Sequence, residues 1–241
     1  MPADAVLHVA GARPNFPKAA PVIRALDRHG VRQRLVHTGQ HYDERMSEVF
    51  FRQLGLPEPD LNLGVGSGSH ASQTAAVMTG LEELMLADRP ALTVVYGDVN
   101  SALAAALVAS KLGVGVAHVE AGLRSFDRSM PEEINRVVVD HVSDLLFATS
   151  PDAVSHLGSE GIAAEKIHLV GNPMIDTLLA NLGGFDEAAA RAEHALTGRY
   201  VVATLHRPAN VDRPGDAAAL VKGLHAVADQ AEVILPLHPR G

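Results

Sequence analysis

Hydrophobic residues in the first 170 positions or so fall into short runs rich in Val and Leu, and helix-period stretches separate these runs. Apolar runs that alternate with amphipathic stretches are typical of βαβ units, in which helices join parallel strands. The expected strands are Val6–Val9, Leu35–His37, Leu92–Tyr96, Val114–Val119, Leu145–Ala148 and His168–Val170. The pattern therefore predicts a doubly wound α/β domain.

The stretches between these strands have the spacing of helices, and several of them begin with Ser, Asp or Pro. These residues are favoured at the first positions of a helix. The expected helices are Pro17–Arg28, Asp43–Leu54, Ser72–Ala87, Ser101–Leu112, Pro131–Val142 and Asp152–Ser159.

A second α/β pattern follows the Gly183-Gly184 pair and an Ala/Glu-rich stretch. It consists of an expected strand, a helix and a strand at Tyr200–Leu205, Asp216–Ala228 and Val233–Leu237. Two strands cannot complete a doubly wound domain, so we expect the second domain to be incomplete. The expected limits are 1–171 for the first domain, 172–198 for connecting helices and 199–241 for the partial second domain.

Composition and charge narrow the class of protein. A chain of 241 residues that is 47% hydrophobic can bury a sizeable core, and small aliphatic residues supply most of its apolar mass. The net charge of −8 argues against a nucleic-acid or anionic-membrane partner, because both need a positive field. The chain has no cysteine, no basic leader and no apolar run long enough for a bilayer. We therefore expect a soluble, cytoplasmic protein.

Polar residues gather where the predicted strands end, which is where open α/β sheets bind ligands. The first strand leads into Gly11-Ala12-Arg13-Pro14 and then Lys18, at the start of a helix. Two cations and a helix N-terminus favour binding of a phosphate or carboxylate. The same pattern is also compatible with a solvated loop.

Two carboxylates follow two other strands: Asp98 comes after the strand that ends at Tyr96, and Glu120 after the strand that ends at Val119. Each also has a structural interpretation. Asp98 is well placed to cap the next helix, and Glu120 to pair with Arg124.

A further carboxylate and cation lie at the start of a predicted helix. Glu132 and Arg136 are four positions apart, so they share one face of the helix. Pro131, Glu132 and Glu133 are also expected at a helix start for structural reasons alone.

Other candidate motifs are weaker. The glycine-rich segment Gly64–Gly68 lacks the spacing of a dinucleotide fingerprint, and Gly39 between His37 and His41 argues against a helical zinc pair. No Walker loop or nucleophile elbow is present, and we expect no metal site.

Taken in chain order, the strand-end segments resemble the non-hydrolysing UDP-N-acetylglucosamine 2-epimerases. That family has two Rossmann-like doubly wound domains of the GT-B type, an architecture shared with many glycosyltransferases. The motifs that carry the resemblance are Gly11-Ala12-Arg13-Pro14 with Lys18, His37-Thr38-Gly39-Gln40-His41, Gly97-Asp98, His118 to Arg124, Pro131-Glu132-Glu133 with Asn135-Arg136, Gly171-Asn172-Pro173, His206-Arg207 and His238-Pro239.

The resemblance implies reversible inversion at C2 of UDP-N-acetylglucosamine to give UDP-N-acetylmannosamine, by elimination and re-addition of UDP and without a cofactor. It implies catalytic roles for Asp98, Glu120, Glu132 and His206, and substrate contacts for Arg13, Lys18, Arg136, Arg124 and His238. Crowded carboxylates are expected to raise one another's pKa, which helps one of them to act as an acid. The resemblance also implies a homodimer.

The chain departs from the family pattern at two places. Ala209 stands where the family commonly has Glu, and family members continue well beyond Gly241. The readings that stay open are a related glycosyltransferase, a hydrolysing 2-epimerase and an inactive truncated fragment.

Overall fold

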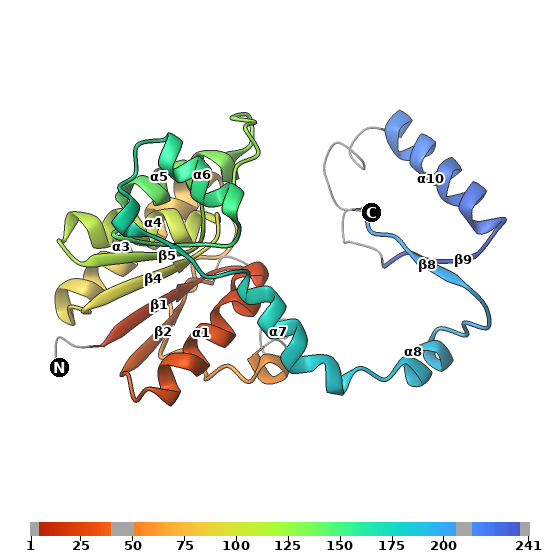
Figure 1. Ribbon diagram of the computed structural model, residues 1–241, viewed down its shortest axis with the longest axis horizontal. Coiled ribbons are helices and arrows are strands. Elements are labelled where there is room, and N and C mark those ends of the chain that lie inside the picture. Colours follow the sequence, from red (N-terminus) through yellow and green to blue (C-terminus); the bar gives the residue numbers. More distant parts are fainter. Residues whose placement is uncertain (1–4, 40–50, 206–213, 237–241) are drawn as a thin grey trace. The chain divides into compact units, whose positions relative to one another are not determined.

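The computed structural model describes residues 5–39, 51–205 and 214–236. The chain divides into two compact units, residues 1–182 and 183–241, and each is described here by itself (Figure 1). Most of the expected helix Asp43–Leu54 lies outside the described residues, although residues 51–54 are helical.

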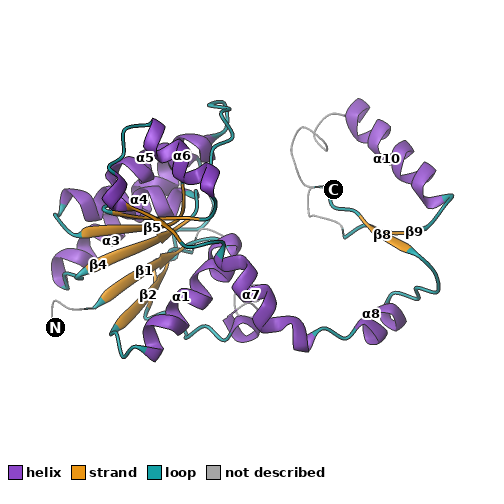
Figure 2. Ribbon diagram, in the orientation of Figure 1, coloured by secondary structure: helices purple, strands orange, loops and turns teal. Residues whose placement is uncertain are grey.

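The described part of the first unit contains a parallel sheet of seven strands in the order β3-β2-β1-β4-β5-β6-β7 (Figure 2). The strands are β1 (Val6–Ala10), β2 (Gln33–His37), β3 (Leu61–Asn62), β4 (Leu92–Tyr96), β5 (Gly115–Ala121), β6 (Leu145–Ala148) and β7 (Ile167–Leu169). The strand order reverses between β1 and β4, so their carboxyl ends flank the crevice that this fold offers to ligands.

Helices cover both faces of the sheet. They are α1 (Phe16–Arg28), α3 (His70–Ala87), α4 (Asn100–Lys111), α5 (Pro131–Val142), α6 (Pro151–Ser159) and α7 (Pro173–Asn181). Leu7 and Val9 of β1 face α3 and α4, whereas Val6 and Ala10 of the same strand pack on the α1 side. Because both faces are buried, the strands are apolar on both sides, as the sequence pattern predicted.

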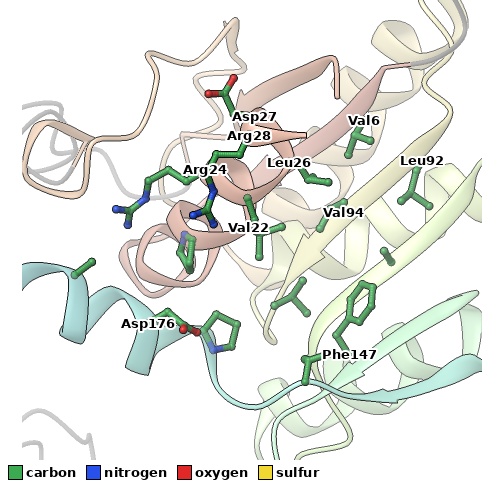
Figure 3. Close-up of a pocket in the computed structure, with 17 residues that line it drawn as sticks. Val6, Val22, Arg24, Leu26, Asp27, Arg28, Leu92, Val94, Phe147 and Asp176 are labelled. Carbon is green, nitrogen blue, oxygen red and sulfur yellow. The ribbon is translucent and has the colours of Figure 1, made fainter. Parts of the chain in front are cut away.

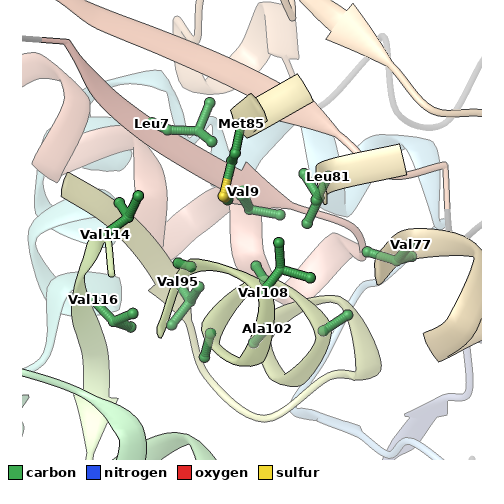
Figure 4. Close-up of a cluster of buried hydrophobic side chains, with 14 of the residues drawn as sticks. Leu7, Val9, Val77, Leu81, Met85, Val95, Ala102, Val108, Val114 and Val116 are labelled. Atoms are coloured by element: carbon green, nitrogen blue, oxygen red, sulfur yellow. The ribbon is translucent and has the colours of Figure 1, made fainter. Parts of the chain in front are cut away.

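The larger core cluster lies between the sheet and α3 and α4 (Figure 4). Val9 is opposite Val36 on one side and Val95 on the other, and Leu81 of α3 packs against this layer. Helix α4 contributes mainly alanines, such as Ala105, whose small side chains let the helix approach the sheet closely. This packing holds the strands that carry the polar strand-end residues.

Polar side chains begin several of the helices. Ser69 accepts a hydrogen bond from the Ser72 backbone at 3.2 Å at the start of α3, and Asn172 accepts one from Met174 at 3.0 Å at the start of α7. Such caps satisfy backbone N–H groups that have no partner inside the helix.

Two features of the first unit differ from the expected elements or add to them. Strand β3 was not predicted, because its two residues are exposed and lack an apolar run. Helix α7 lies beside α1, and Thr177 donates a hydrogen bond to the Pro17 carbonyl at 2.6 Å. This helix is therefore part of the first compact unit, and the domain limits expected at 171 and 199 stay predictions.

The described part of the second unit is small. It contains α8 (Glu187–Glu193), β8 (Tyr200–Val202), α10 (Pro214–Ala228) and β9 (Glu232–Ile234), with β8 and β9 paired in parallel. This is the expected strand–helix–strand order, with shorter strands. No helix in the described ranges is both long enough and apolar enough to cross a membrane.

The core arrangement predicts a large difference between two leucines of α3. Leu81 is fully buried, whereas Leu86 is 68% exposed. Leu81→Ala is expected to lower the free energy of unfolding by about 2–5 kcal/mol, because it leaves a cavity under the sheet. Leu86→Ala is the matched control, with an expected change of about 0.5 kcal/mol or less. Urea unfolding measures both, and equal losses would contradict this packing.

Candidate active site

Four charged side chains meet at the carboxyl ends of the central strands. Lys18 comes from the first turn of α1, Asp98 follows β4, Glu120 lies in β5, and Arg136 comes from α5. We call these four residues the strand-end cluster. They lie at the carboxyl edge of the sheet, near the point where the strand order reverses between β1 and β4, which is the expected position for a ligand site.

Lys18 and Glu120 form a nearly buried ion pair. The Lys18 Nζ lies 2.5 Å from Glu120 Oε1, and the two side chains are 6% and 12% exposed. Gly97 makes room for this pair, since a Cβ at that position would lie 2.7 Å from Lys18 Nζ. The positive φ of 63° at Gly97 also favours glycine.

The backbone of Glu120 is strained. Its φ is 74°, in the left-handed region that a long side chain seldom adopts. The pairing of β5 with β6 shifts register between Val119 and Ala121, so Glu120 sits in a bulge. Bulges re-aim side chains, and strain of this kind persists where surrounding contacts hold it.

The second ion pair joins Asp98 and Arg136. Arg136 Nη2 lies 2.5 Å from Asp98 Oδ2, and both side chains are about one fifth exposed. The side chain of Asn135 donates to the Asp98 carbonyl at 2.8 Å. Neighbouring residues of α5 therefore hold both the side chain and the backbone of Asp98.

The sequence pattern did not predict the contacts that Glu133 makes. Its carboxylate accepts hydrogen bonds from the backbone N–H groups of Ser125 and Phe126 at 2.9 and 3.0 Å, and from Arg136 at 2.9 Å. Burial alone would raise the pKa of Glu133, but these hydrogen bonds outweigh it and lower the pKa to about 2. Glu132 is half-buried, and its side chain forms no hydrogen bond or ion pair with the residues that the structure describes.

Asn15 connects the loops after β1 and β4. Its Oδ1 accepts hydrogen bonds from the backbone N–H groups of Gly11 and Ala12, both at 3.0 Å, and its Nδ2 donates to the Tyr96 carbonyl at 2.7 Å. The side chain is 1% exposed. The only sequence signal for this role is the position of Asn15 between the strand-end glycine and the helix.

Arg124 is committed to other protein groups. It is 1% exposed, and its guanidinium contacts Asp140 at 2.8 Å, Glu160 at 2.6 Å and the Leu123 carbonyl at 2.8 Å. The suggested pairing of Arg124 with Glu120 is wrong, because Glu120 is held by Lys18 instead. A ligand contact by Arg124 is not supported by this geometry, because its donors already have buried acceptors.

Among the remaining predicted residues, Arg13 lies within the described part of the chain, and the predicted histidines do not. Arg13 is exposed in the short helix after β1, where its guanidinium faces solvent. His206, His238 and His41 lie outside the described residues. The part of the chain that the structure describes has no group of three or more His, Asp or Glu side chains that could hold a metal ion.

A large apolar cavity lies elsewhere in the first unit (Figure 3). It has a volume of about 780 Å³, lies beside α1 and α7, and reaches the first residues of β1 and β4. Val6, Val22, Leu26, Leu92, Val94 and Phe147 are among its lining residues. No member of the strand-end cluster lines it, so it is separate from the polar site.

The strand-end cluster combines two carboxylates with two cations. Carboxylates at strand ends are suited to taking and returning a proton, and Lys and Arg are suited to holding a phosphate group. Glu120 pairs with Lys18, and Asp98 pairs with Arg136, which Glu133 also contacts.

Comparison with known proteins agrees with this architecture. The family model described as UDP-N-acetylglucosamine 2-epimerase matches residues 24–241. The chain belongs to this family. A UDP-N-acetylglucosamine 2-epimerase of Methanocaldococcus jannaschii is 43% identical over 242 residues, which cover 96% of this chain and 65% of that protein. The family predicted from the motifs is thus confirmed.

Another relative is named for a different substrate. The UDP-2,3-diacetamido-2,3-dideoxy-D-glucuronate 2-epimerase of Pseudomonas aeruginosa is 44% identical over 241 residues, covering 98% of this chain and 67% of that protein. Epimerases of this family therefore differ in the sugar that their names specify.

Solved structures confirm the fold class. The Methanocaldococcus jannaschii epimerase in complex with UDP-GlcNAc and UDP is similar with a TM-score of 0.90 and 42% identity, over 98% of this chain and 66% of that one. The Neisseria meningitidis enzyme bound to UDP-GlcNAc has a TM-score of 0.88 at 26% identity, with the same coverage. The chain thus spans about two thirds of the length of these relatives.

The space at Gly97 generates one prediction. Gly97→Ala and Gly30→Ala both place a side chain at a positive φ, but only the Cβ at 97 meets Lys18, while the Cβ at 30 meets nothing within 4 Å. Gly97→Ala is expected to cost about 1–3 kcal/mol more unfolding free energy, because it displaces a buried ion pair. Denaturant unfolding of both variants measures this difference. Equal losses would mean that the pair tolerates the methyl group.

The low pKa of Glu133 generates a second prediction for this site. Its folded value of about 2 is below the ordinary value of 4.5, so its contribution to stability is present above about pH 5 and is lost as the pH falls toward 2. The stability difference between the unchanged chain and Glu133→Gln is therefore expected to be large at about pH 6 and smaller at about pH 3. Glu132→Gln is the control, and it should change stability little at either pH. A pH-independent difference for Glu133→Gln would contradict the assignment.

Proposed function

We propose that this chain carries the proton-transfer site of a UDP-N-acetylglucosamine 2-epimerase, which interconverts UDP-N-acetylglucosamine and UDP-N-acetylmannosamine. The observation that carries the proposal is the pair of strand-end carboxylates, Asp98 and Glu120, each held by a cation near the point where the strand order reverses between β1 and β4. Membership of the epimerase family supports the reaction type.

The proposed reaction is an elimination followed by an addition. A carboxylate takes the proton from C2 while the C1–O bond breaks and its electron pair leaves with UDP. The resulting glycal has a double bond between C1 and C2. A proton then returns to C2 on the opposite face while UDP re-forms the bond to C1, so the atoms balance without an oxidant or reductant.

Asp98 and Glu120 are the proposed proton-transfer groups. Glu132 is a third candidate, because its side chain is half-buried and forms no hydrogen bond or ion pair with the described residues. Inversion needs an acid and a base on opposite faces of the sugar, which two carboxylates from neighbouring strands supply. Their ion pairs with Lys18 and Arg136 hold the two carboxylates in place until a ligand competes for the cations.

Lys18 and Arg136 are proposed to hold the departing diphosphate. Charge that develops on the leaving group is stabilised best by cations that are already in place. Arg13, exposed beside the same strand end, is a proposed outer contact. Roles for His206 and His238 and a homodimer rest on the resemblance alone, and a cytoplasmic location rests on the composition of the chain.

A second substrate is favoured by one observation. The relative named for UDP-2,3-diacetamido-2,3-dideoxy-D-glucuronate is 44% identical to this chain, as similar as the relatives named for UDP-N-acetylglucosamine. The C2 chemistry is the same, and the sugars differ at C3 and in the carboxylate at C6. Assaying both nucleotide sugars in parallel decides between them.

Exchange of the C2 proton tests the proposed function. In deuterated water the chain is expected to introduce deuterium at C2 of the nucleotide sugar and to form the manno isomer, followed by mass spectrometry and NMR. Asp98→Asn and Glu120→Gln are each expected to slow this exchange at least about 100-fold, because they remove a proton-transfer group. Glu82→Gln, on the exposed side of α3, is the control and should leave the rate unchanged.

Absence of exchange with either sugar would contradict the proposed activity for this chain. Exchange that persists in both Asp98→Asn and Glu120→Gln would contradict the assignment of these carboxylates.

A further inference from the structure

We propose that Asp140 is a positioning residue for proton transfer: its carboxylate holds the His118 side chain before Glu120 and the Gly122 backbone N–H after it and, through His118, the turn that carries Asp98. The inference rests on the proposed function, because it concerns the placement of the same two carboxylates. Asp140 lies on α5 and is 1% exposed, so it acts through other residues and not by touching a ligand.

The two oxygens of Asp140 bind two points of the same strand end. Oδ1 lies 2.6 Å from His118 Nδ1, and Oδ2 accepts the backbone N–H of Gly122 at 3.1 Å. His118 and Gly122 are the residues two positions before and two positions after Glu120. One carboxylate therefore spans the bulge in which Glu120 sits.

Glu120 needs such a support. Its φ of 74° is unfavourable for a residue with a Cβ, and a conformation of this kind persists only where neighbouring contacts determine it. Gly122 adds a second constraint, because its Cα packs so closely that a Cβ would lie 2.4 Å from the Ala153 carbonyl oxygen. Loss of the Asp140 contacts would free the bulge to relax and would move the Glu120 carboxylate.

The same carboxylate reaches Asp98 through His118. The Nε2 of His118 donates a hydrogen bond to the Gly97 carbonyl at 2.9 Å, directly before Asp98 in the chain. The Nδ1 of the same ring faces Asp140 Oδ1 at 2.6 Å, so the carboxylate fixes the ring against the turn after β4.

Arg124 and Glu160 complete the network. Arg124 Nη1 lies 2.8 Å from Asp140 Oδ2, and its Nε and Nη2 bind the two oxygens of Glu160 at 2.7 and 2.6 Å. Arg124 thus bridges the carboxylates of Asp140 and Glu160. Buried charges are tolerated when they are paired and hydrogen-bonded in this way.

A matched control lies on the same strand. The carboxylate of Asp144 accepts the backbone N–H of Val116 at 3.0 Å, so it too supports β5, but at the end away from Glu120. A purely structural role predicts that Asp140→Ala lowers stability more than Asp144→Ala, because the Asp140 side chain is buried and that of Asp144 is 58% exposed, and that neither change alters turnover of the folded enzyme. A positioning role predicts that only Asp140 affects turnover.

The experiment compares Asp140→Ala, Asp140→Asn and Asp144→Ala in the full chain, with kcat and KM of C2 deuterium exchange as readouts. Asp140→Ala is expected to lower kcat about 100-fold while KM stays within about threefold, because the groups that bind substrate remain but the reacting carboxylates shift. In Asp140→Asn, the amide oxygen can accept the Gly122 N–H and the amide nitrogen can donate to His118 Nδ1. This variant is therefore expected to recover kcat to within about tenfold. Asp144→Ala should leave kcat unchanged.

Three results overturn the proposal: equal loss of kcat in Asp140→Ala and Asp144→Ala, an effect of Asp140→Ala on KM alone, or no recovery in Asp140→Asn. If Asp140→Ala does not fold, His118→Gln decides, because it cuts the bridge between Asp140 and Gly97. Its kcat is expected to fall at least about tenfold with KM retained, and an unchanged kcat overturns the proposal.

Amide hydrogen exchange separates failure of this inference from failure of the proposed function. If the unchanged chain shows no C2 exchange, the function fails, and the Gly122 amide then decides the positioning claim. Exchange at this amide is measured in Asp140→Ala, Asp140→Asn and Asp144→Ala. If Asp140→Ala does not fold, Asp140→Asn is compared with Asp144→Ala. Exchange at Gly122 should rise at least about tenfold in Asp140→Ala and stay protected in the other two variants. Unchanged protection in Asp140→Ala, or lost protection in Asp140→Asn, contradicts the clamp.

Discussion

Pairing of charge at a desolvated sheet edge is the interaction on which the rest of this structure depends. Glu120 is almost buried, and a carboxylate in that setting needs a cation within contact distance, which Lys18 supplies at 2.5 Å. Asp98 is held in the same manner by Arg136. Because Lys18 and Arg136 come from different helices, these pairs tie α1 to β5 and α5 to the end of β4. The polar site and the packing of the first unit are therefore parts of one arrangement.

This arrangement is built from backbone features as much as from side chains. Gly97 leaves the space that Lys18 occupies, Asn15 links the loops after β1 and β4, and the bulge at Glu120 turns its carboxylate toward the lysine. The bulge is costly by itself, which is why Asp140 and its partners behind it matter. The strained bulge at the candidate site is thus supported by the buried contacts of Asp140 with His118, Gly122 and Arg124.

The sequence predicted the parts of this picture that depend on local pattern. Apolar runs located six of the strands in the first unit, and position after a strand singled out Asp98 and Glu120. Contacts between residues distant in the sequence could not be predicted from local pattern. Lys18 and Glu120 are 102 positions apart, and their pairing depends on the strand order. For the same reason Arg124 was matched with Glu120, its neighbour in sequence, when its acceptors are Asp140 and Glu160. Periodicity alone could not separate Glu132 from Glu133, because helix position decides which of two adjacent carboxylates is buried.

The strand-end cluster is proposed as the place where a nucleotide sugar reacts, and a crystal structure of the chain with UDP-N-acetylglucosamine bound is the most direct test. C2 of the sugar is expected to lie within about 3.5 Å of the Asp98 or Glu120 carboxylate, the distance needed for proton transfer, with the diphosphate against Lys18 or Arg136. A sugar bound away from these carboxylates, for example in the apolar cavity beside α1 and α7, would contradict it.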